Sequence, residues 1–262
     1  MADITTEDPF VLTRRDARGV LTLTLNRPKS FNALSEGMLA ALQSELALIE
    51  QDESVRAVIL AGAGKAFCAG HDLKQMRAEP SLDYYRQLFA ECSKVMLAIQ
   101  RLPVPVIARV HGIATAAGCQ LVAACDLAVA ASEARFAVSG VNYGLFCSTP
   151  SVTLSRNVSR KAAFEMLVTG DFISAQQALD KGLVNRVVAS DALDAEIETL
   201  AASIVAKPRE AIAIGKQLFY RQLDKGLAAA LEDAGQTMAC NMMEPSALEG
   251  IQAFIEKRAP NW

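Results

Sequence analysis

Alternating apolar and polar positions open the chain. The segments Phe10–Arg14 and Val20–Leu25 both follow this two-residue period, and a short connection ending in Gly19 separates them. Alternation is typical of strands, and Asp16 and Gly19 favour a tight turn between them. The pattern therefore predicts a β-hairpin.

Segments with helical periodicity then alternate with predicted strands along the chain. Apolar residues three and four apart predict helices over residues 36–49 and 82–99, with Ser35 placed to cap the first. A shorter helix is predicted over residues 119–124. Short apolar runs predict strands over residues 55–60, 106–110, 126–130 and 135–137. Strands that alternate with helices indicate an α/β fold.

Helices dominate the chain from Pro150 onward. Ser174 and Gln177 have the spacing of a capping box, which marks a helix start. One last strand is predicted over residues 184–188. The helical pattern then covers residues 191–206, 208–220, 223–238 and 246–258.

Composition narrows the class of protein. Of 262 residues, 52% are hydrophobic and 21% charged, with a net charge of -3, which fits a globular chain without the basic surface that nucleic acids require. No charge-free apolar run approaches the roughly 18 residues of a membrane span. The acidic residues 1–8 lack the apolar core of a signal peptide, so the expected location is cytoplasmic.

Histidine and cysteine limit the metal chemistry. His71 and His111 are the only histidines, and no two of the six cysteines form a C-x-x-C pair. A metal site is therefore not expected, and the cysteines are interpreted as small buried thiols of a reducing compartment.

Familiar nucleotide and hydrolase motifs fail. Gly62 and Gly64 follow a predicted strand, but Phe67 stands where a dinucleotide loop needs its third glycine. No Walker sequence and no G-x-S-x-G elbow occurs.

Two loops of small residues have a common arrangement that suggests a binding site. Residues 67–73 and 112–118 each follow a predicted strand, and the second opens a helix. Small residues let a ligand approach the backbone, and amides at a helix start point outward. Two such amides meeting at one carbonyl oxygen would stabilise an oxyanion, although turns of small residues also serve packing alone.

The sequence blocks around these loops resemble the crotonase (enoyl-CoA hydratase/isomerase) superfamily. The resemblance lies in Asn26–Lys29 with Asn32–Leu34, in residues 64–73, 105–112, 118–121 and 125–126, in residues 169–171 and 178–184, and in residues 256–258. It implies a spiral of ββα turns followed by a C-terminal helical trimerisation region. It also implies the lyase and isomerase chemistry of fatty-acid metabolism, with an acyl-CoA thioester as substrate, coenzyme A entering as part of it, and no separate cofactor.

The resemblance divides the chain and suggests its assembly. Residues 1–200 would form the spiral core, and residues 201–262 the helical oligomerisation region. Homotrimers or dimers of trimers are the implied assemblies, with no nucleic-acid or membrane partner.

The resemblance also implies site residues. The oxyanion-hole amides map to His71 and Ala117, and Phe254 and Lys257 map to a helix that closes over the nucleotide of a neighbouring subunit. The remaining substrate-binding positions are Lys29, Ala33, Ala69, Gly70, Asp72, Leu73 and Lys74.

The chain departs from the family at two catalytic positions. Hydratases carry glutamates where this sequence has Gln120 and Gly140. A glutamine amide cannot accept a proton at neutral pH, and glycine has no side chain. Hydratase activity should therefore be weak or absent. The departure resembles the branch called enoyl-CoA-hydratase-domain-containing proteins, and this resemblance leaves the reaction open. The double variant Gln120→Glu, Gly140→Glu should restore hydration if the rest of the site is intact.

Two other functions stay open. The protein could be an active isomerase or thioester hydrolase that uses His71 or Cys147, with Tyr143, Asp126 and Glu133 as further candidates. It could also be a non-catalytic scaffold subunit. The structural interpretations are a packing thiol at Cys147 with hydroxyls capping the following helix, a structural carboxylate at Asp126 and a turn residue at His111.

Overall fold

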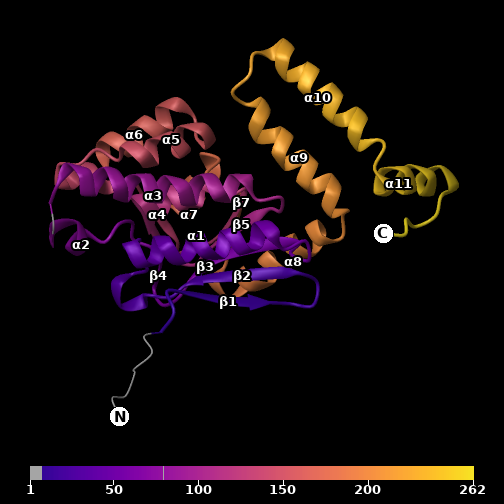
Figure 1. Cartoon of the computed structure of the whole chain (residues 1–262). Helices are drawn as coiled ribbons and strands as arrows, with labels where there is room; N and C mark the ends of the chain where they lie inside the picture. The colour runs from indigo at the N-terminus through magenta and orange to yellow at the C-terminus, as the bar shows by residue number, and fades with distance from the viewer. Residues whose placement is uncertain (1–7, 79) are drawn as a thin grey trace.

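The computed structural model describes residues 8–78 and 80–262 of the chain (Figure 1). The targeting expectation rests on residues 1–8, and residues 1–7 lie outside the described part. Strands alternate with helices in the first two thirds, and helices close the chain. The predicted α/β class is confirmed.

A six-stranded sheet has the strand order β1-β2-β3-β5-β7-β10. The predicted hairpin is confirmed, because β1 (Val11–Arg15) and β2 (Val20–Leu25) pair antiparallel. All later neighbours in this sheet pair in parallel. They are β3 (Ala57–Gly62), β5 (Val106–Val110), β7 (Leu127–Ala131) and β10 (Arg186–Val188).

A second sheet explains the spiral. It has the order β4-β6-β8-β9 and contains β4 (Ala66–Cys68), β6 (Ile113–Thr115), β8 (Arg135–Ala137) and β9 (Ile173–Ser174). The strands β4, β6 and β8 follow β3, β5 and β7 directly, so each turn of chain gives one strand to each sheet. The ββα spiral is therefore confirmed. The sequence prediction missed β4, β6 and β9, since a run of two or three residues carries little periodicity, although β8 and β10, of three residues each, were predicted.

Helices cover both faces of the larger sheet. The helices α1 (Glu36–Gln51) and α3 (Leu82–Arg101) pack on the face that includes Val58 and Leu60, and α8 (Leu193–Val205) packs on the face that includes Ile59. Ser35 caps α1 as predicted, because its hydroxyl accepts the N–H of Met38. Successive side chains of β3 thus point to opposite faces of the sheet and pack into two separate apolar layers.

Shorter helices complete the spiral. The capping box of Ser174 and Gln177 is confirmed at the start of α7. These helices are α2 (Leu73–Ala78), α4 (Ala117–Ala124), α5 (Ser148–Asn157), α6 (Arg160–Thr169) and α7 (Ala175–Asp180). Short 3-10 turns span Pro28–Ser30, Ser139–Tyr143 and Ser190–Ala192.

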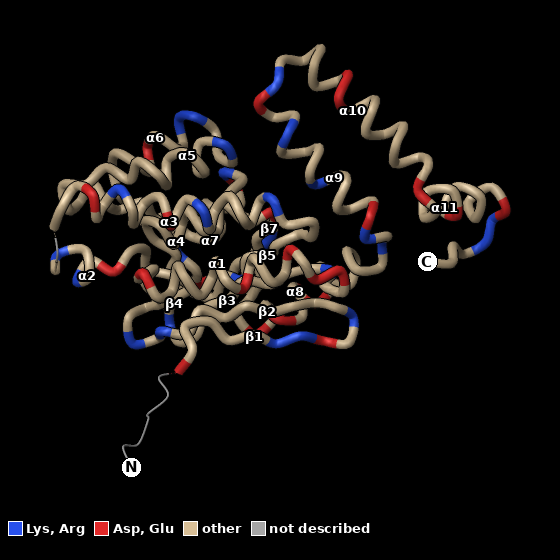
Figure 2. Tube along the Cα trace, viewed as in Figure 1, with Lys and Arg blue, Asp and Glu red and all other residues tan. Residues whose placement is uncertain are grey.

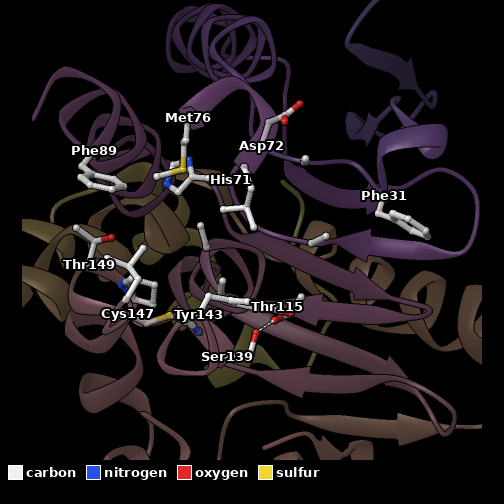
Figure 3. Close-up of a pocket in the computed structure, with 18 of the residues that line it drawn as sticks. Phe31, His71, Asp72, Met76, Phe89, Thr115, Ser139, Tyr143, Cys147 and Thr149 are labelled. Atoms are coloured by element: carbon white, nitrogen blue, oxygen red, sulfur yellow. Dashed lines mark hydrogen bonds between the residues drawn. The ribbon is translucent and has the colours of Figure 1, made fainter. Parts of the chain in front are cut away.

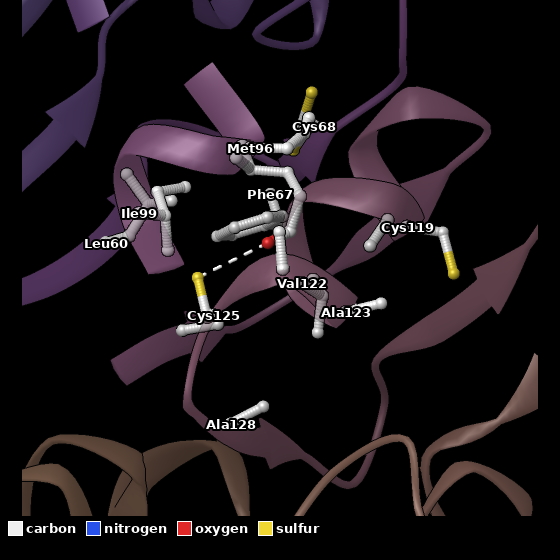
Figure 4. Close-up of a cluster of buried hydrophobic side chains, with 14 of the residues drawn as sticks. Leu60, Phe67, Cys68, Met96, Ile99, Cys119, Val122, Ala123, Cys125 and Ala128 are labelled. Atoms are coloured by element: carbon white, nitrogen blue, oxygen red, sulfur yellow. Dashed lines mark hydrogen bonds between the residues drawn. The ribbon is translucent and has the colours of Figure 1, made fainter. Parts of the chain in front are cut away.

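Thiols take part in the central packing. Cys68, Cys119 and Cys125 are buried in the apolar core, and the sulfur of Cys125 donates to the carbonyl of Leu121 (Figure 4). Cys240 departs from the expectation of buried thiols, because it is exposed on α10 (Leu227–Asn241).

The last three helices project away from the sheets (Figure 1). They are α9 (Arg209–Gln222), α10 (Leu227–Asn241) and α11 (Pro245–Glu256). Charges are sparse along α10, where Glu232 and Asp233 are the charged residues (Figure 2). Apolar side chains on α10, on α11 and between them are instead exposed, among them Leu227, Leu231, Met238, Met243, Phe254 and Ile255.

Helix α8 crosses residue 200 without a break, and the division of the chain at that residue stays a prediction. Within the described residues, no helix combines the length and the apolar character needed to cross a membrane.

Candidate functional site

Three parallel strands of the smaller sheet end at the same edge, and the segments that follow them line one cavity. β4, β6 and β8 are neighbours, and their continuations are residues 69–72, 116–117 and 138–140. The cavity has a volume of about 550 Å³ (Figure 3). The predicted site residues that line it are Lys29, Ala33, Ala69, His71, Asp72, Leu73, Lys74, Ala117 and Gly140.

Gly70 lies behind the cavity wall and sets the spacing of two loops. Its φ is +89°, which favours glycine, and a Cβ there would lie 3.0 Å from Cβ of Ala116 and 3.2 Å from N of Ala117. The loops that carry His71 and Ala117 are thus in direct contact.

The amides of His71 and Ala117 are available to a ligand. Ala117 is the first residue of α4, and neither its N–H nor that of His71 donates to another described residue. Ala116 precedes the helix with φ 51° and ψ -120°, a conformation that costs a residue with a Cβ about 1–3 kcal/mol. The fold retains this strain where it orients the Ala117 amide.

Gln120, a predicted site position, is buried in α4 and is not among the described residues that line the cavity. It is three residues after Ala117 and four after Ala116, so the three residues share one face of α4. Gln120 is 4% exposed, and its Oε1 has no hydrogen-bond partner among the described residues. Buried polar atoms are rarely left unpaired, so this one indicates a partner that a ligand or water supplies.

Burial favours the neutral form of the His71 imidazole. Burial lowers its pKa, although the hydrogen bond to the carbonyl of Leu34 acts in the opposite direction. Nδ1 lies 3.3 Å from that carbonyl oxygen and therefore carries the proton, which leaves Nε2 as an acceptor without a partner in the described chain. The ring packs edge-on against Phe89, 5.4 Å between centroids.

Hydroxyls and a thiol line the opposite wall. Thr115 and Ser139 lie side by side with 2.9 Å between their oxygens (Figure 3). The N–H of Gly140 donates to Sγ of Cys147 at 3.3 Å. Burial raises the pKa of the Cys147 thiol.

The space beside Gly140 is filled. A Cβ at position 140 would lie 2.3 Å from the carbonyl oxygen of Leu145 and 2.7 Å from Sγ of Cys147. A glutamate therefore cannot be added there unless the 145–147 segment moves. Recovery of hydration by the double variant Gln120→Glu, Gly140→Glu therefore stays a prediction, and it requires this movement as well.

The other candidates separate into two groups. Tyr143 lines the cavity with an exposed ring, and Cys147 lines it while almost buried. No side chain caps α5, so the predicted capping by hydroxyls after Cys147 is wrong. Glu133 lies outside the cavity and accepts a hydrogen bond from Ser190.

Asp126 and His111 have the structural roles predicted for them. Asp126 accepts hydrogen bonds from Lys216 at 2.6 Å, from Tyr220 and from the backbone of Val106. Nε2 of His111 lies 2.8 Å from the carbonyl oxygen of Gly64 in a turn.

Phe254 and Lys257 lie at the end of the projecting helices and do not line the cavity of their own chain. Phe254 is 85% exposed. Their contact with the nucleotide bound to a neighbouring subunit stays a prediction.

Sequence reasoning missed three residues at the site. Asn32 is fully buried, and its Nδ2 donates to the carbonyls of Ala63 and Ala66, which holds the chain before β4 in place. Met76 and Phe89 form an apolar wall. Met76 belongs to the six-residue helix α2, which has no buried residue and therefore no apolar stripe to predict it. Phe89 is only half-buried, at the edge of the buried stripe of α3.

Carboxylates are scarce at the cavity. Among the described residues that line it, Asp72 is the only carboxylate, and its Oδ1 accepts the amides of Lys74 and Gln75 at the start of α2. The free amides and apolar walls suit a carbonyl compound with a hydrocarbon tail.

Known proteins are similar to this chain over almost its whole length. A family model described as enoyl-CoA hydratase/isomerase matches residues 15–262. Human enoyl-CoA hydratase domain-containing protein 3, named as mitochondrial, is 45% identical over 97% of this chain and 84% of its own. A crystal structure of that human protein has a TM-score of 0.93, covering 97% of this chain and 100% of that one. A crystal structure titled enoyl-CoA hydratase from Mycobacterium smegmatis is 70% identical, with a TM-score of 0.97 over 97% and 99% of the two chains.

Proposed function

Because the chain belongs to the enoyl-CoA hydratase/isomerase family, we propose that it binds acyl-CoA thioesters in the cavity behind β4, β6 and β8. The observation that carries this proposal is the pair of unbonded amides at His71 and Ala117. They would hold the thioester oxygen in an oxyanion hole, helped by the positive end of α4. Lys29 and Lys74 at the cavity supply positive charge for the phosphates of coenzyme A.

Hydration is expected to be weak. Gln120 and Gly140 stand where hydratases use glutamates, and each general acid or base contributes about 10²- to 10⁴-fold to rate. Asp72 is held at its own helix start and gives no free base. The protein would therefore bind the thioester without efficient addition of water.

An acyl-CoA panel tests both statements. Saturated and unsaturated thioesters are added to the purified chain, and the shift in melting temperature is recorded together with turnover. We expect stabilisation by acyl-CoA and crotonyl-CoA hydration far below 10 s⁻¹, about the median rate constant of enzymes. Hydration at or above that rate would refute the argument from the missing carboxylates, and the absence of any shift would refute acyl-CoA binding.

Thioester hydrolysis or isomerisation is the second candidate, since Cys147 and His71 both line the cavity. Hydrolysis would release free coenzyme A, which a thiol reagent detects. Full release by a Cys147→Ala variant would eliminate the version that uses Cys147. Stabilisation by thioesters with no turnover of any kind would favour the scaffold function instead.

Assembly and location complete the proposal. The exposed apolar residues of α10 and α11 support a homotrimer or a dimer of trimers, because a monomer rarely exposes so many. Light scattering on the purified chain would distinguish these assemblies from a monomer. A cytoplasmic location stays a proposal. The human relative described above is named as mitochondrial, and cell fractionation distinguishes the two locations.

A further inference from the structure

Among the cysteines in the described part of the chain, Cys147 is the one that lines the cavity. It is 7% exposed. The other cysteines differ in position: Cys68, Cys92, Cys119 and Cys125 lie in the core, and Cys240 is on the surface of α10.

A chain of contacts links this sulfur to the loop that carries the amide of Ala117. Sγ accepts the N–H of Gly140, and the adjacent Ser139 touches Thr115, two residues before Ala117. Cys147 also directly precedes the ten-residue helix α5. A backbone donor and a helix start both favour the anionic form of a thiol.

Two unpaired polar atoms point to a ligand at this cavity. Oε1 of Gln120 has no hydrogen-bond partner among the described residues although this residue is 4% exposed. Gln120 itself does not line the cavity, but it lies about one helical turn after Ala117, which does. Nε2 of His71 is likewise unpaired. The sulfur therefore lies in a cavity whose polar groups lack partners that a ligand or water would supply.

We propose that Cys147 captures α,β-unsaturated acyl thioesters by conjugate addition. This step rests on the proposed binding of acyl-CoA. The sulfur forms a bond to the β-carbon, the electrons of the carbon–carbon double bond move to the thioester oxygen between the amides of His71 and Ala117, and the α-carbon then takes up a proton. The thiol proton is released to water, so the S–H bond adds across the double bond with no net oxidation or reduction.

Burial opposes the anionic sulfur, because it raises the pKa of Cys147 above its ordinary value. At neutral pH the thiol form dominates, and capture should accelerate as pH rises toward that pKa. The oxyanion hole compensates by activating the acceptor carbon rather than the sulfur.

Intact-protein mass spectrometry of the full chain tests the proposal. The chain in a Cys240→Ser background is incubated with crotonyl-CoA or with saturated butyryl-CoA, and the adduct is located by peptide mapping. We expect a gain equal to one whole crotonyl-CoA on Cys147, none with butyryl-CoA, and loss of the adduct in Cys147→Ser. Labelling of folded protein should exceed that of urea-unfolded protein by about tenfold or more.

Each alternative outcome would contradict either the conjugate addition at Cys147 or the proposed binding of acyl-CoA. A gain of the acyl group alone, with free coenzyme A released, would overturn conjugate addition in favour of acyl transfer. No adduct while butyryl-CoA still raises the melting temperature would overturn this inference and leave the proposed function intact. The absence of any shift with butyryl-CoA would refute the proposed function itself. Mapping on the chain with native Cys147 needs no folded Cys147→Ser variant.

Discussion

Gly140 and Cys147 share one space: the amide of Gly140 donates to Sγ of Cys147 at 3.3 Å, and a methyl group at position 140 would lie 2.7 Å from that sulfur. The position that lacks a carboxylate is thus closed by the chain itself. A longer side chain at position 140 therefore requires the 145–147 segment to move.

Gly140→Ala should lower the free energy of unfolding by about 1–3 kcal/mol, because the methyl group overlaps Leu145 and Cys147. Urea titration measures it. Gly215→Ala in α9 is the matched control, since a Cβ there meets nothing within 4 Å; it should stabilise the protein by about 0.5–1 kcal/mol. Equal effects at both positions would show that the overlap is not real.

Ala116→Gly should stabilise the protein by about 1 kcal/mol. Relief of the strained backbone at φ 51° gains about 1–3 kcal/mol, and the greater freedom of glycine in the unfolded chain costs about 0.4–1 kcal/mol. Thermal unfolding measures the change. Ala123→Gly in the same helix, where the backbone is regular, should instead destabilise by about 1 kcal/mol. A loss of stability at both positions would argue against strain at Ala116.

His71 should make the protein less stable in mild acid. Its pKa is lowered by burial, so the unfolded chain takes up a proton first as pH falls below about 6.5. The contribution is complete above that pH and is lost as pH falls toward the folded-state pKa, at up to about 1.4 kcal/mol per pH unit. Urea titrations at pH 7.5 and 5.5 should show a larger loss for the native chain than for His71→Gln. Identical losses would mean that the ring is not buried as described.

Lys216→Met should destabilise the protein by about 3–5 kcal/mol, because it leaves the carboxylate of Asp126 without its cation. Lys216 also donates to the carbonyls of Ile99 and Val104, which adds to the loss. The additional change Asp126→Asn should recover part of the stability, as measured by denaturant unfolding. The exposed pair of Arg86 and Asp83 serves as control and should contribute less than about 1 kcal/mol. An effect as small at Lys216 would contradict a buried ion pair.

Sequence periodicity predicts elements that bury a continuous apolar stripe. The hairpin of β1 and β2, the helices α1 and α3, and the strands β5 and β8 lie at or within two residues of their predicted bounds. Periodicity does not predict the strands β4, β6 and β9. Each has only two or three residues, and their pairing rests on backbone contacts that leave little pattern in the sequence.

The site follows the same rule. The cavity positions of His71, Ala117 and Gly140 could be predicted because small residues and family motifs mark their loops. The closing of the Gly140 side could not, because it depends on where the carbonyl of Leu145 lies in three dimensions. Nor does a sequence show that Lys216, predicted only as part of a helix, reaches Asp126 90 positions away.

The spiral also has a consequence for how the protein responds to a ligand. The cavity receives its wall from three successive turns, through the continuations of β4, β6 and β8, so no single turn contains it. A thioester that binds there would hold these turns together and would be linked to their docking. Amide hydrogen exchange should then slow in all three turns together when the thioester binds. The strands of the smaller sheet would in that case open and close as one cooperative unit that the ligand stabilises.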